Sequence, residues 1–211
     1  MKIEYEATFI NIDKAKIRKK LKEVGAKLVK TEFLQRRVVF NLPKGYEIKG
    51  GWLRVRDEGD KTTLSLKVVD GNKIENQKEI CLEVNDFQKA ELLLTTIGCK
   101  KKAYQENKRE VWILEDVEIT IDEWPFLEPF VEIEGESESV VKKTAEKLEF
   151  NYKKALFCAT DTLYNKKYGT PLAVINKIPK ITFDDQNPFI FSARKPRGSV
   201  RGDEWQPVAE R

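Results

Sequence analysis

The sequence predicts an α+β protein of predominantly antiparallel β structure, with roughly eight strands and helices packed outside them. Three observations lead to this fold class. Short segments in which apolar and polar residues alternate recur along most of the chain, and this is the period of a strand. Turn residues separate several of them at short intervals, which favours antiparallel neighbours. Between them lie segments with apolar residues at helical spacing, each preceded by a capping residue.

Eight segments have the alternation of a strand. In the first, Ile3 and Tyr5 share one face, whereas Glu4 and Glu6 share the other. A turn at 58–61 joins two of the segments into a hairpin. The predicted strands are 2–10, 33–42, 52–57, 62–69, 77–84, 108–114, 117–123 and 129–135.

Three helices are predicted from a capping residue followed by apolar residues at helical spacing. They run from Asp13 to Gly25, from Asp86 to Gly98, and from Ser137 or Ser139 to about residue 148. A fourth is expected over about 153–167. The first two span the same number of residues between aspartate and glycine, as an internal duplication would produce.

The composition changes after residue 168, where Pro, Asn, Asp and Arg become frequent and the periodicity fades. We therefore expect one domain over 1–168 and an extended tail over 169–211, which docks in part or stays mobile. The basic cluster at 194–197 could contact nucleic acid, but a solvated tail is the preferred interpretation.

Charge and residue usage exclude several classes of protein. The chain has 211 residues, with 39 basic and 35 acidic side chains and a net charge of +4. Charges of one sign do not dominate, which argues against a protein that coats nucleic acid and leaves room for a site where both signs meet. The complete lack of histidine excludes His-dependent triads and His-ligated metals.

The expected location is the cytoplasm. Three scattered cysteines, Cys81, Cys99 and Cys158, are typical of reduced thiols, since their number is odd and no zinc spacing is present. No apolar run is long enough to predict a transmembrane helix, and the first residues lack the apolar core of a signal peptide.

Two acidic pairs are candidate metal ligands. Glu4 and Glu6 project from one face of a predicted strand, and Glu132 and Glu134 do the same on another, with Asp122 at the end of the preceding strand. So many carboxylates are costly to gather unless a cation offsets them, and oxygen ligands suit Mg²⁺ or Mn²⁺. Each pair taken alone is more simply read as solvent-exposed glutamates.

Basic residues on the central strands are candidate phosphate ligands. Arg54 and Arg56 share one face of a strand, and Lys67 lies on the polar face of the next. Arg109 and Lys78 are further candidates, although apolar residues share their parity. Guanidinium groups bind phosphate oxygens bidentately, and lysine adds charge. The simpler alternative is cross-strand salt bridging with the glutamates.

Taken together, the acidic and basic faces would line the interior of one barrel, which would suit phosphoryl transfer by position and electrostatics. In this respect the chain resembles the CYTH family, also called triphosphate tunnel metalloenzymes, over about residues 2–165. That family includes class IV adenylate cyclases, thiamine triphosphatases and inorganic triphosphatases. The residues that carry the resemblance are Glu4–Thr8 (family E-x-E-x-K), Leu53–Arg56 and Thr63–Lys67 (L-R-x-R and T-L-x-x-K), Lys108–Trp112 (K-x-R-x-x-W, shifted at the lysine) and Asp122–Gly135 (D-x-x-P through E-I-E-G).

The resemblance implies a closed or nearly closed barrel of about eight strands with a polar tunnel, and it assigns roles to individual residues. The implied metal ligands for Mg²⁺ or Mn²⁺ are Glu4, Glu6, Glu132 and Glu134, with Asp122 helping. The implied triphosphate ligands are Arg54, Arg56, Lys67 and Arg109, with Lys78 as a further lysine. The glutamates of the first pair and these four main cations form the implied catalytic set.

One departure from the family pattern bears on activity, because Thr8 stands where the signature has lysine. Threonine supplies no positive charge, so either a divalent cation activates water, or turnover is weak, or the protein binds without turnover. We therefore expect metal-dependent hydrolysis of a nucleoside, thiamine or inorganic triphosphate. The alternatives are cyclisation of ATP to cyclic AMP and non-catalytic sensing. The expected partner is a small triphosphate; a homodimer is possible, a membrane is not expected, and a nucleic acid is the weakest candidate.

Overall fold

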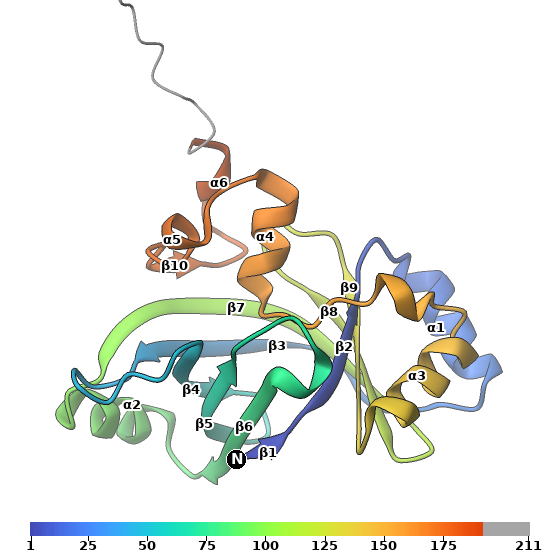
Figure 1. Ribbon diagram of the computed structural model, residues 1–211, viewed down its shortest axis with the longest axis horizontal. Helices are drawn as coiled ribbons and strands as arrows, with labels where there is room; N and C mark the ends of the chain where they lie inside the picture. Colours follow the sequence, from blue (N-terminus) through green and yellow to red (C-terminus); the bar gives the residue numbers. More distant parts are fainter. Residues whose placement is uncertain (192–211) are drawn as a thin grey trace, which may run out of the picture.

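The computed structural model describes residues 1–191 as one ten-stranded sheet wrapped into a barrel (Figure 1). All neighbouring strands on the path β1-β6-β5-β4-β3-β7-β8-β9-β2 are antiparallel, and β10 pairs in parallel with β7 outside that path. The strands are β1 (Lys2–Ile3), β2 (Tyr5–Phe9), β3 (Lys27–Asn41), β4 (Gly51–Asp57), β5 (Thr62–Val69), β6 (Gln77–Val84), β7 (Lys100–Leu114), β8 (Val117–Glu123), β9 (Phe130–Gly135) and β10 (Lys180–Ile181).

The N-terminal segment nearly closes the barrel. Its first part, β1, pairs with β6, and its second part, β2, pairs with β9, so that one short segment joins the two edges of the sheet. Between them, the backbone N–H of Glu4 donates to Gln77 O at 3.0 Å. The predicted class, α+β with a closed or nearly closed barrel, is confirmed.

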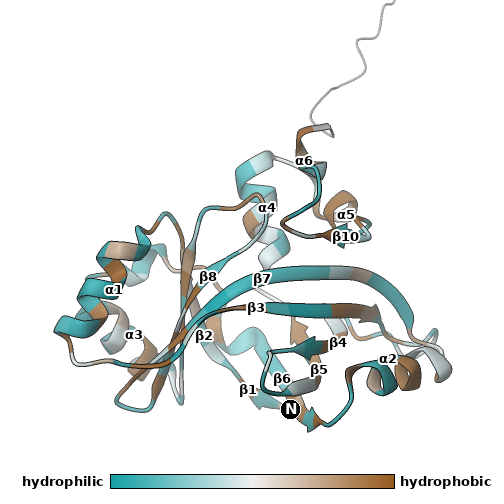
Figure 2. Ribbon diagram, turned by 180° about the vertical axis from the view of Figure 1, so that it is seen from behind, coloured by the Kyte–Doolittle hydropathy of each residue, from teal (hydrophilic) through white to brown (hydrophobic). Residues whose placement is uncertain are grey.

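Two strands are longer than the sequence predicts. β3 begins at Lys27 instead of residue 33, and β7 begins at Lys100 instead of residue 108. They pair with each other from Lys27 to Asn41, with three register irregularities. The added stretches carry polar side chains on both faces, so alternation does not mark them. Figure 2 shows this polarity as long teal stretches of β3 and β7.

Three helices cover the outer, apolar face of the barrel, so the polar face of the sheet lies inside. They are α1 (Lys14–Glu23), α2 (Phe87–Thr96) and α3 (Glu138–Lys147), and their N-cap side chains are those of Asp13, Asp86 and Ser137, as predicted. The first and third helices pack on one side of the barrel, in a core that includes Ala7, Leu21, Ile119, Ile133 and Val141. The second covers β4 and β5 over Val38, Phe40, Val55, Ala90 and Leu94.

The predicted helix over 153–167 is two separate elements. A 3₁₀ turn, η2 (Tyr152–Lys154), is followed by extended chain, in which Leu156 bridges to Thr8. The helix α4 (Thr160–Tyr168) begins only after it. The extended stretch is held by two backbone hydrogen bonds to β2, which a continuous helix could not make.

Residues 169–191 fold over the barrel, so this part of the expected tail docks, and it forms short elements where extended chain was expected. They form α5 (Leu172–Ile175), β10 and α6 (Pro188–Phe191), and we call the region from α4 to α6 the cap. Phe189 stacks on Tyr164 with ring centroids 4.2 Å apart, and Ile175 and Ile181 are buried beside them. In Figure 2, α5 and α6 are largely brown, in keeping with this apolar packing. Residues 192–211, with the basic cluster at 194–197, lie outside the described residues.

A short 3₁₀ turn, η1 (Ile74–Asn76), precedes β6 and places Ile74 in the core beneath β2. No helix within residues 1–191 is long and apolar enough to span a membrane.

Candidate functional site

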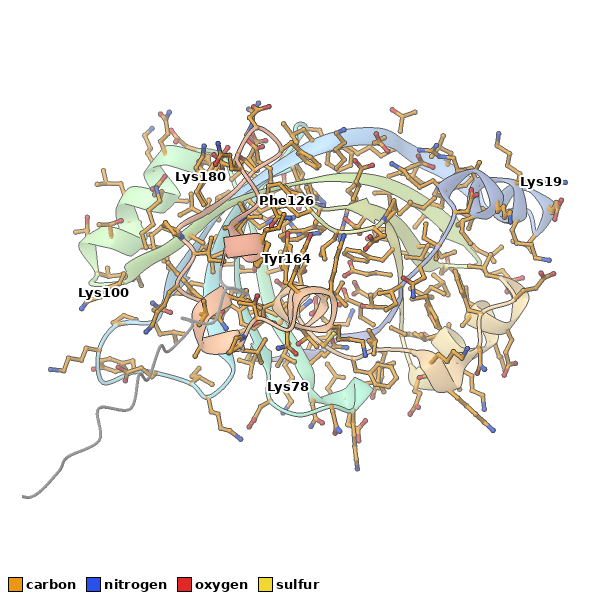
Figure 3. All side chains as sticks on the ribbon, turned by 90° about the horizontal axis from the view of Figure 1, so that it is seen from above. Lys19, Lys78, Lys100, Phe126, Tyr164 and Lys180 are labelled. Carbon is orange, nitrogen blue, oxygen red and sulfur yellow. The ribbon has the colours of Figure 1, made fainter. Side chains whose placement is uncertain are left out.

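A polar cavity fills the barrel and continues beneath the cap. Strands on every side of the barrel contribute to its wall, and the cap contributes α4 and residues around α5. Figure 3, a view from above, places Tyr164 of the cap over the middle of the barrel. The basic side chains that line the cavity are Arg37, Arg54, Arg56, Lys67, Lys102 and Arg109. The acidic ones are Glu4, Glu6, Glu79, Glu118, Glu132, Glu134 and Asp161.

The alternation of β4 places two arginines in the cavity. Arg54 and Arg56 face inward, whereas Val55 between them is fully buried against α2 on the outer face. Each guanidinium is held by a carboxylate: Arg54 Nη2 lies 2.9 Å from Glu79 Oε1, and Arg56 Nη2 lies 2.7 Å from Glu58 Oε1. The two predicted phosphate ligands are therefore together and oriented.

Lys67 on β5 contacts the first acidic pair. With Arg54, Arg56 and Arg109 it forms what we call the basic wall of the cavity. Its Nζ lies 3.0 Å from Glu4 Oε2 and 3.5 Å from Glu6 Oε1. Burial alone would lower the pKa of Lys67, but the two carboxylates reverse this and raise its pKa above the ordinary value. The ammonium is thus charged at any physiological pH, and both members of the Glu4/Glu6 pair meet it.

Arg109 on β7 reaches the second acidic group. Its Nε and Nη2 donate to the two oxygens of Asp122 at 2.9 and 2.8 Å, and Nη2 also donates to Glu132 at 2.6 Å. Burial would lower the pKa of Arg109, yet these carboxylates raise it well above its usual value. Arg109 therefore lines the cavity, although Val111 and Ile113 share its parity in the sequence.

Asp122 does not face the cavity as a metal ligand would. It is fully buried, and besides binding Arg109 it accepts hydrogen bonds from Asn107 Nδ2 at 2.7 Å and Thr120 Oγ1 at 2.8 Å. These contacts already engage both carboxylate oxygens. In this arrangement Asp122 positions the guanidinium of Arg109.

The carboxylates of β9 are poised between protonation states. Burial and the nearby Glu6 raise the pKa of Glu132 to about 8, with Asp122 adding to the shift and Arg109 opposing it. Burial and Glu6 likewise raise the pKa of Glu134 to about 7. The two acidic pairs of the sequence are therefore close enough to repel each other. A bound cation would relieve that repulsion.

Lys78 lies outside the cavity, so the expectation that it binds triphosphate does not fit its position. It is exposed at the edge of the barrel in Figure 3, and Glu79, the next residue of β6, faces inward instead. Ile80 and Leu82 share the face of Lys78 and are 46% and 57% exposed. The apolar residues of β6 therefore mark its outer face, which agrees with the parity of Lys78 in the sequence.

Five further charged side chains that sequence reasoning missed line the cavity: Arg37, Glu79, Lys102, Glu118 and Asp161. Burial raises the pKa of Glu4 to about 8, and the neighbouring Glu79 adds to that shift. The alternation of β6 could have predicted the inward direction of Glu79, because it lies on the face opposite Ile80 and Leu82. Arg37 and Lys102 lie on the long β3–β7 pair, whose alternation is too weak to orient them.

The family model for the CYTH domain matches residues 2–163, which is most of the chain. The chain belongs to the CYTH domain family. A protein of Methanocaldococcus jannaschii named "Putative adenylate cyclase" is 29% identical over 174 residues, covering 79% of this chain and 96% of that protein.

Solved CYTH-like structures share the fold. A protein of Vibrio parahaemolyticus, named "a putative adenylate cyclase", superposes with a TM-score of 0.67 at 10% identity over 77% of this chain and 97% of its own. A Hippeastrum protein, described as a "putative adenylyl cyclase" that reveals a dominant triphosphatase activity, gives a TM-score of 0.50 at 13% identity over 80% of this chain and 98% of its own. At these identities the likeness concerns the fold.

The donor chemistry of this CYTH cavity fits a hard divalent cation. The candidate ligands are all carboxylate oxygens, which Mg²⁺ and Mn²⁺ prefer. Burial, and after it repulsion between the carboxylates, raises the pKa of Glu132 and Glu134. Within residues 1–191, no three acidic or cysteine side chains already converge closely enough to ligate one ion. Lys67 and Arg109 hold several of these carboxylates, so cation binding would require those contacts to be exchanged.

Thr8, at the signature lysine position, is enclosed rather than presented to the cavity. It is 2% exposed, and its backbone exchanges hydrogen bonds of 2.9 and 3.0 Å with Leu156, in the segment that leads to the cap. Its side chain is not among those that line the cavity. In this CYTH protein, Thr8 therefore does not itself line the cavity, although it lies opposite the cavity-lining Glu132 in the pairing of β2 with β9.

Proposed function

We propose that this protein binds a triphosphate compound in its barrel and hydrolyses it with the help of a divalent cation. The observation that carries the proposal is the juxtaposition of inward guanidinium and ammonium groups with two repelling acidic pairs in one enclosed cavity. Guanidinium groups bind phosphate oxygens in bidentate fashion, and acidic pairs of this kind hold metal ions. Few other ligands need both at once.

The basic residues would hold the phosphate chain by exchanging partners. Arg54, Arg56, Lys67 and Arg109 are each charged and already oriented by a carboxylate, so a phosphate can replace that carboxylate with little loss of side-chain freedom. As negative charge builds up on the transferred group and on the leaving oxygen, these cations would stabilise it.

The acidic pairs would hold the cation: Glu4 and Glu6 from β2, and Glu132 and Glu134 from β9. Asp122 would act through Arg109. When bound, a divalent cation polarises phosphate oxygens and makes water a better nucleophile at neutral pH. Thr8 carries no positive charge and does not line the cavity, so it would take no part in that activation.

Cyclisation of ATP is a second candidate, because the M. jannaschii relative is named as an adenylate cyclase. It would use the same basic wall, but the attacking group would be a ribose hydroxyl and pyrophosphate would leave. Binding without turnover is a third, and the replacement of the signature lysine by Thr8 supports it. A homodimer and a cytoplasmic location remain predictions from the sequence.

Product analysis by ³¹P NMR separates these functions. The protein is incubated with ATP, tripolyphosphate or thiamine triphosphate in turn, with Mg²⁺ or Mn²⁺ and with chelator as the blank. Orthophosphate that requires metal and is lost in Glu132→Gln supports hydrolysis. Formation of cyclic AMP and pyrophosphate from ATP would show that the reaction is cyclisation and not hydrolysis. Binding without any product would leave the sensor, and absence of binding would overturn the proposal.

A further inference from the structure

Arg37 on β3 differs from the other arginines of the cavity in having no carboxylate partner. Arg54, Arg56 and Arg109 each bind an acidic side chain, whereas Arg37 makes no ion pair within residues 1–191. Its Nη2 donates to two neutral amide oxygens, Gln35 Oε1 at 3.0 Å and Asn107 Oδ1. Its Nε is buried and has no hydrogen-bond partner. The side chain nevertheless lines the cavity and is only 5% exposed.

A buried guanidinium without a counter-charge is costly for the folded protein. The indole of Trp124, 4.5 Å from the guanidinium carbon, offsets a part of that cost through a cation–π contact. Burial, together with the nearby Arg54, Arg56 and Arg109, lowers the pKa of Arg37, although a guanidinium stays protonated at physiological pH. Asp122 opposes this shift but is itself bound to Arg109. Within the described residues, the charge of Arg37 is therefore the one in this group of arginines without a carboxylate partner of its own, and an anion in the cavity would supply one.

A buried hydrogen-bond relay fixes the orientation of Arg37. Asn107 accepts from Arg37 and donates to Asp122 at 2.7 Å, and Asp122 in turn binds Arg109. Asn107 and Gln35 are both fully buried, so neither can turn toward solvent. The position of the Arg37 guanidinium is therefore linked to that of Arg109 through Asn107 and Asp122.

Arg37 also lies at the cap end of the group of arginines. Its strand partner Gln105 on β7 pairs with Ile181 of β10 in the cap, and its guanidinium packs on Trp124, which belongs to the same buried cluster as Tyr164 of α4. A phosphate chain that extends from Arg54, Arg56 and Arg109 toward the cap would meet Arg37 next.

We propose that Arg37 is a further anion-binding residue, which contacts the phosphate group nearest the cap and makes the cavity prefer a triphosphate to a diphosphate. This rests on the proposed function of the same cavity. Arg37 needs no carboxylate to be displaced before it binds, and a diphosphate held by the paired cations would leave it uncompensated. The substrate class that satisfies the cavity is therefore a chain of at least three phosphates.

The test compares Arg37→Gln with Arg36→Gln, which removes the same charge from the exposed neighbour on the same strand. Calorimetric titrations of tripolyphosphate and of pyrophosphate are made with the full-length protein and Mg²⁺. We expect Arg37→Gln to weaken tripolyphosphate binding by at least about tenfold and pyrophosphate binding by less, so that the preference between them shrinks. A merely structural role would weaken both equally, and Arg36→Gln should bind like wild type.

Equal tripolyphosphate affinity in Arg37→Gln and wild type, or equal loss for both anions, would overturn the role of Arg37 and leave the proposed function standing. If wild type binds neither anion, both fail together. Should Arg37→Gln not fold, Arg37→Lys decides the matter, because it keeps the charge but loses the bidentate fork. We expect it to bind tripolyphosphate several-fold more weakly than wild type, and unchanged affinity would overturn the proposal.

Discussion

Replacing Arg54 by alanine tests the basic wall most sharply. Arg54 Nη2 lies 2.9 Å from Glu79 Oε1, and the two side chains are only 10% and 11% exposed. A charge-assisted hydrogen bond to a phosphate contributes about 1.5–3 kcal/mol, so Arg54→Ala should weaken triphosphate binding by roughly 10- to 150-fold. The effect arises because alanine leaves one phosphate oxygen without its guanidinium.

The same substitution also affects stability. Glu79 loses a buried partner, and breaking such a pair costs about 3–5 kcal/mol when nothing replaces it. Lys67 and Ser65 remain close to Glu79, so the loss should fall below that range. The melting temperature of the variant is therefore determined first by thermal denaturation, and binding is measured well below it.

The matched control is Lys78→Ala, which removes one positive charge from β6 on the face outside the cavity. Isothermal titration of tripolyphosphate with Mg²⁺ is made on wild type and both variants. Lys78→Ala should bind like wild type. If Arg54→Ala also keeps the wild-type affinity while remaining folded, the basic wall is not the triphosphate site, even though the barrel is unchanged.

Three further results are expected. Glu132→Gln should weaken Mn²⁺ binding in a calorimetric titration without lowering the melting temperature. The control Glu136→Gln, on the exposed chain beyond β9, should bind Mn²⁺ like wild type. Equal metal affinity in both variants would exclude Glu132 as a ligand. Because the folded pKa values of Glu132 and Glu134 lie at about 8 and 7, above the ordinary 4.5, their contribution to stability is complete below pH 4.5 and is lost as the pH rises through 7–8. The melting temperature of the metal-free protein should thus fall between about pH 5 and 8, and less so in Glu132→Gln; a flat profile would contradict the assignment. Phe189→Ala should destabilise the cap by about 3–5 kcal/mol, because the ring is fully buried on Tyr164. Limited proteolysis of this variant should therefore cut residues 169–191 before the barrel. Equal resistance of the cap and the barrel would contradict this role of Phe189.

The sequence predicts best where one face of a strand is apolar and covered. On β4 and β9 the alternation places Arg54, Arg56, Glu132 and Glu134 on the polar face, and all four line the cavity. The caps of α1, α2 and α3 are likewise readable, because a short polar side chain satisfies the first free N–H groups of a helix wherever it occurs.

The rest depends on contacts between distant parts of the chain. The N-terminal segment joins both edges of the barrel only because Glu4 sits between β1 and β2, which no local pattern reveals. The added stretches of β3 and β7 carry polar side chains on both faces, so the length of these strands could not be predicted. Around Arg37, the next residues Val38, Val39 and Phe40 are apolar on both faces, so alternation does not show which way Arg37 points. Asp122 has the right motif, but its burial behind Arg109 is a tertiary fact. The cap is likewise held by Tyr164 and residues of the following segment, whose composition suggested an extended tail.

The most direct test of the central claim is a crystal structure with tripolyphosphate and Mn²⁺, in which anomalous scattering locates the metal. We expect phosphate density between Arg54, Arg56, Lys67 and Arg109, with the anomalous peak beside the carboxylates of β2 and β9. Phosphate and metal bound elsewhere, with the salt bridges of the cavity intact, would contradict the assignment of this barrel as a triphosphate site.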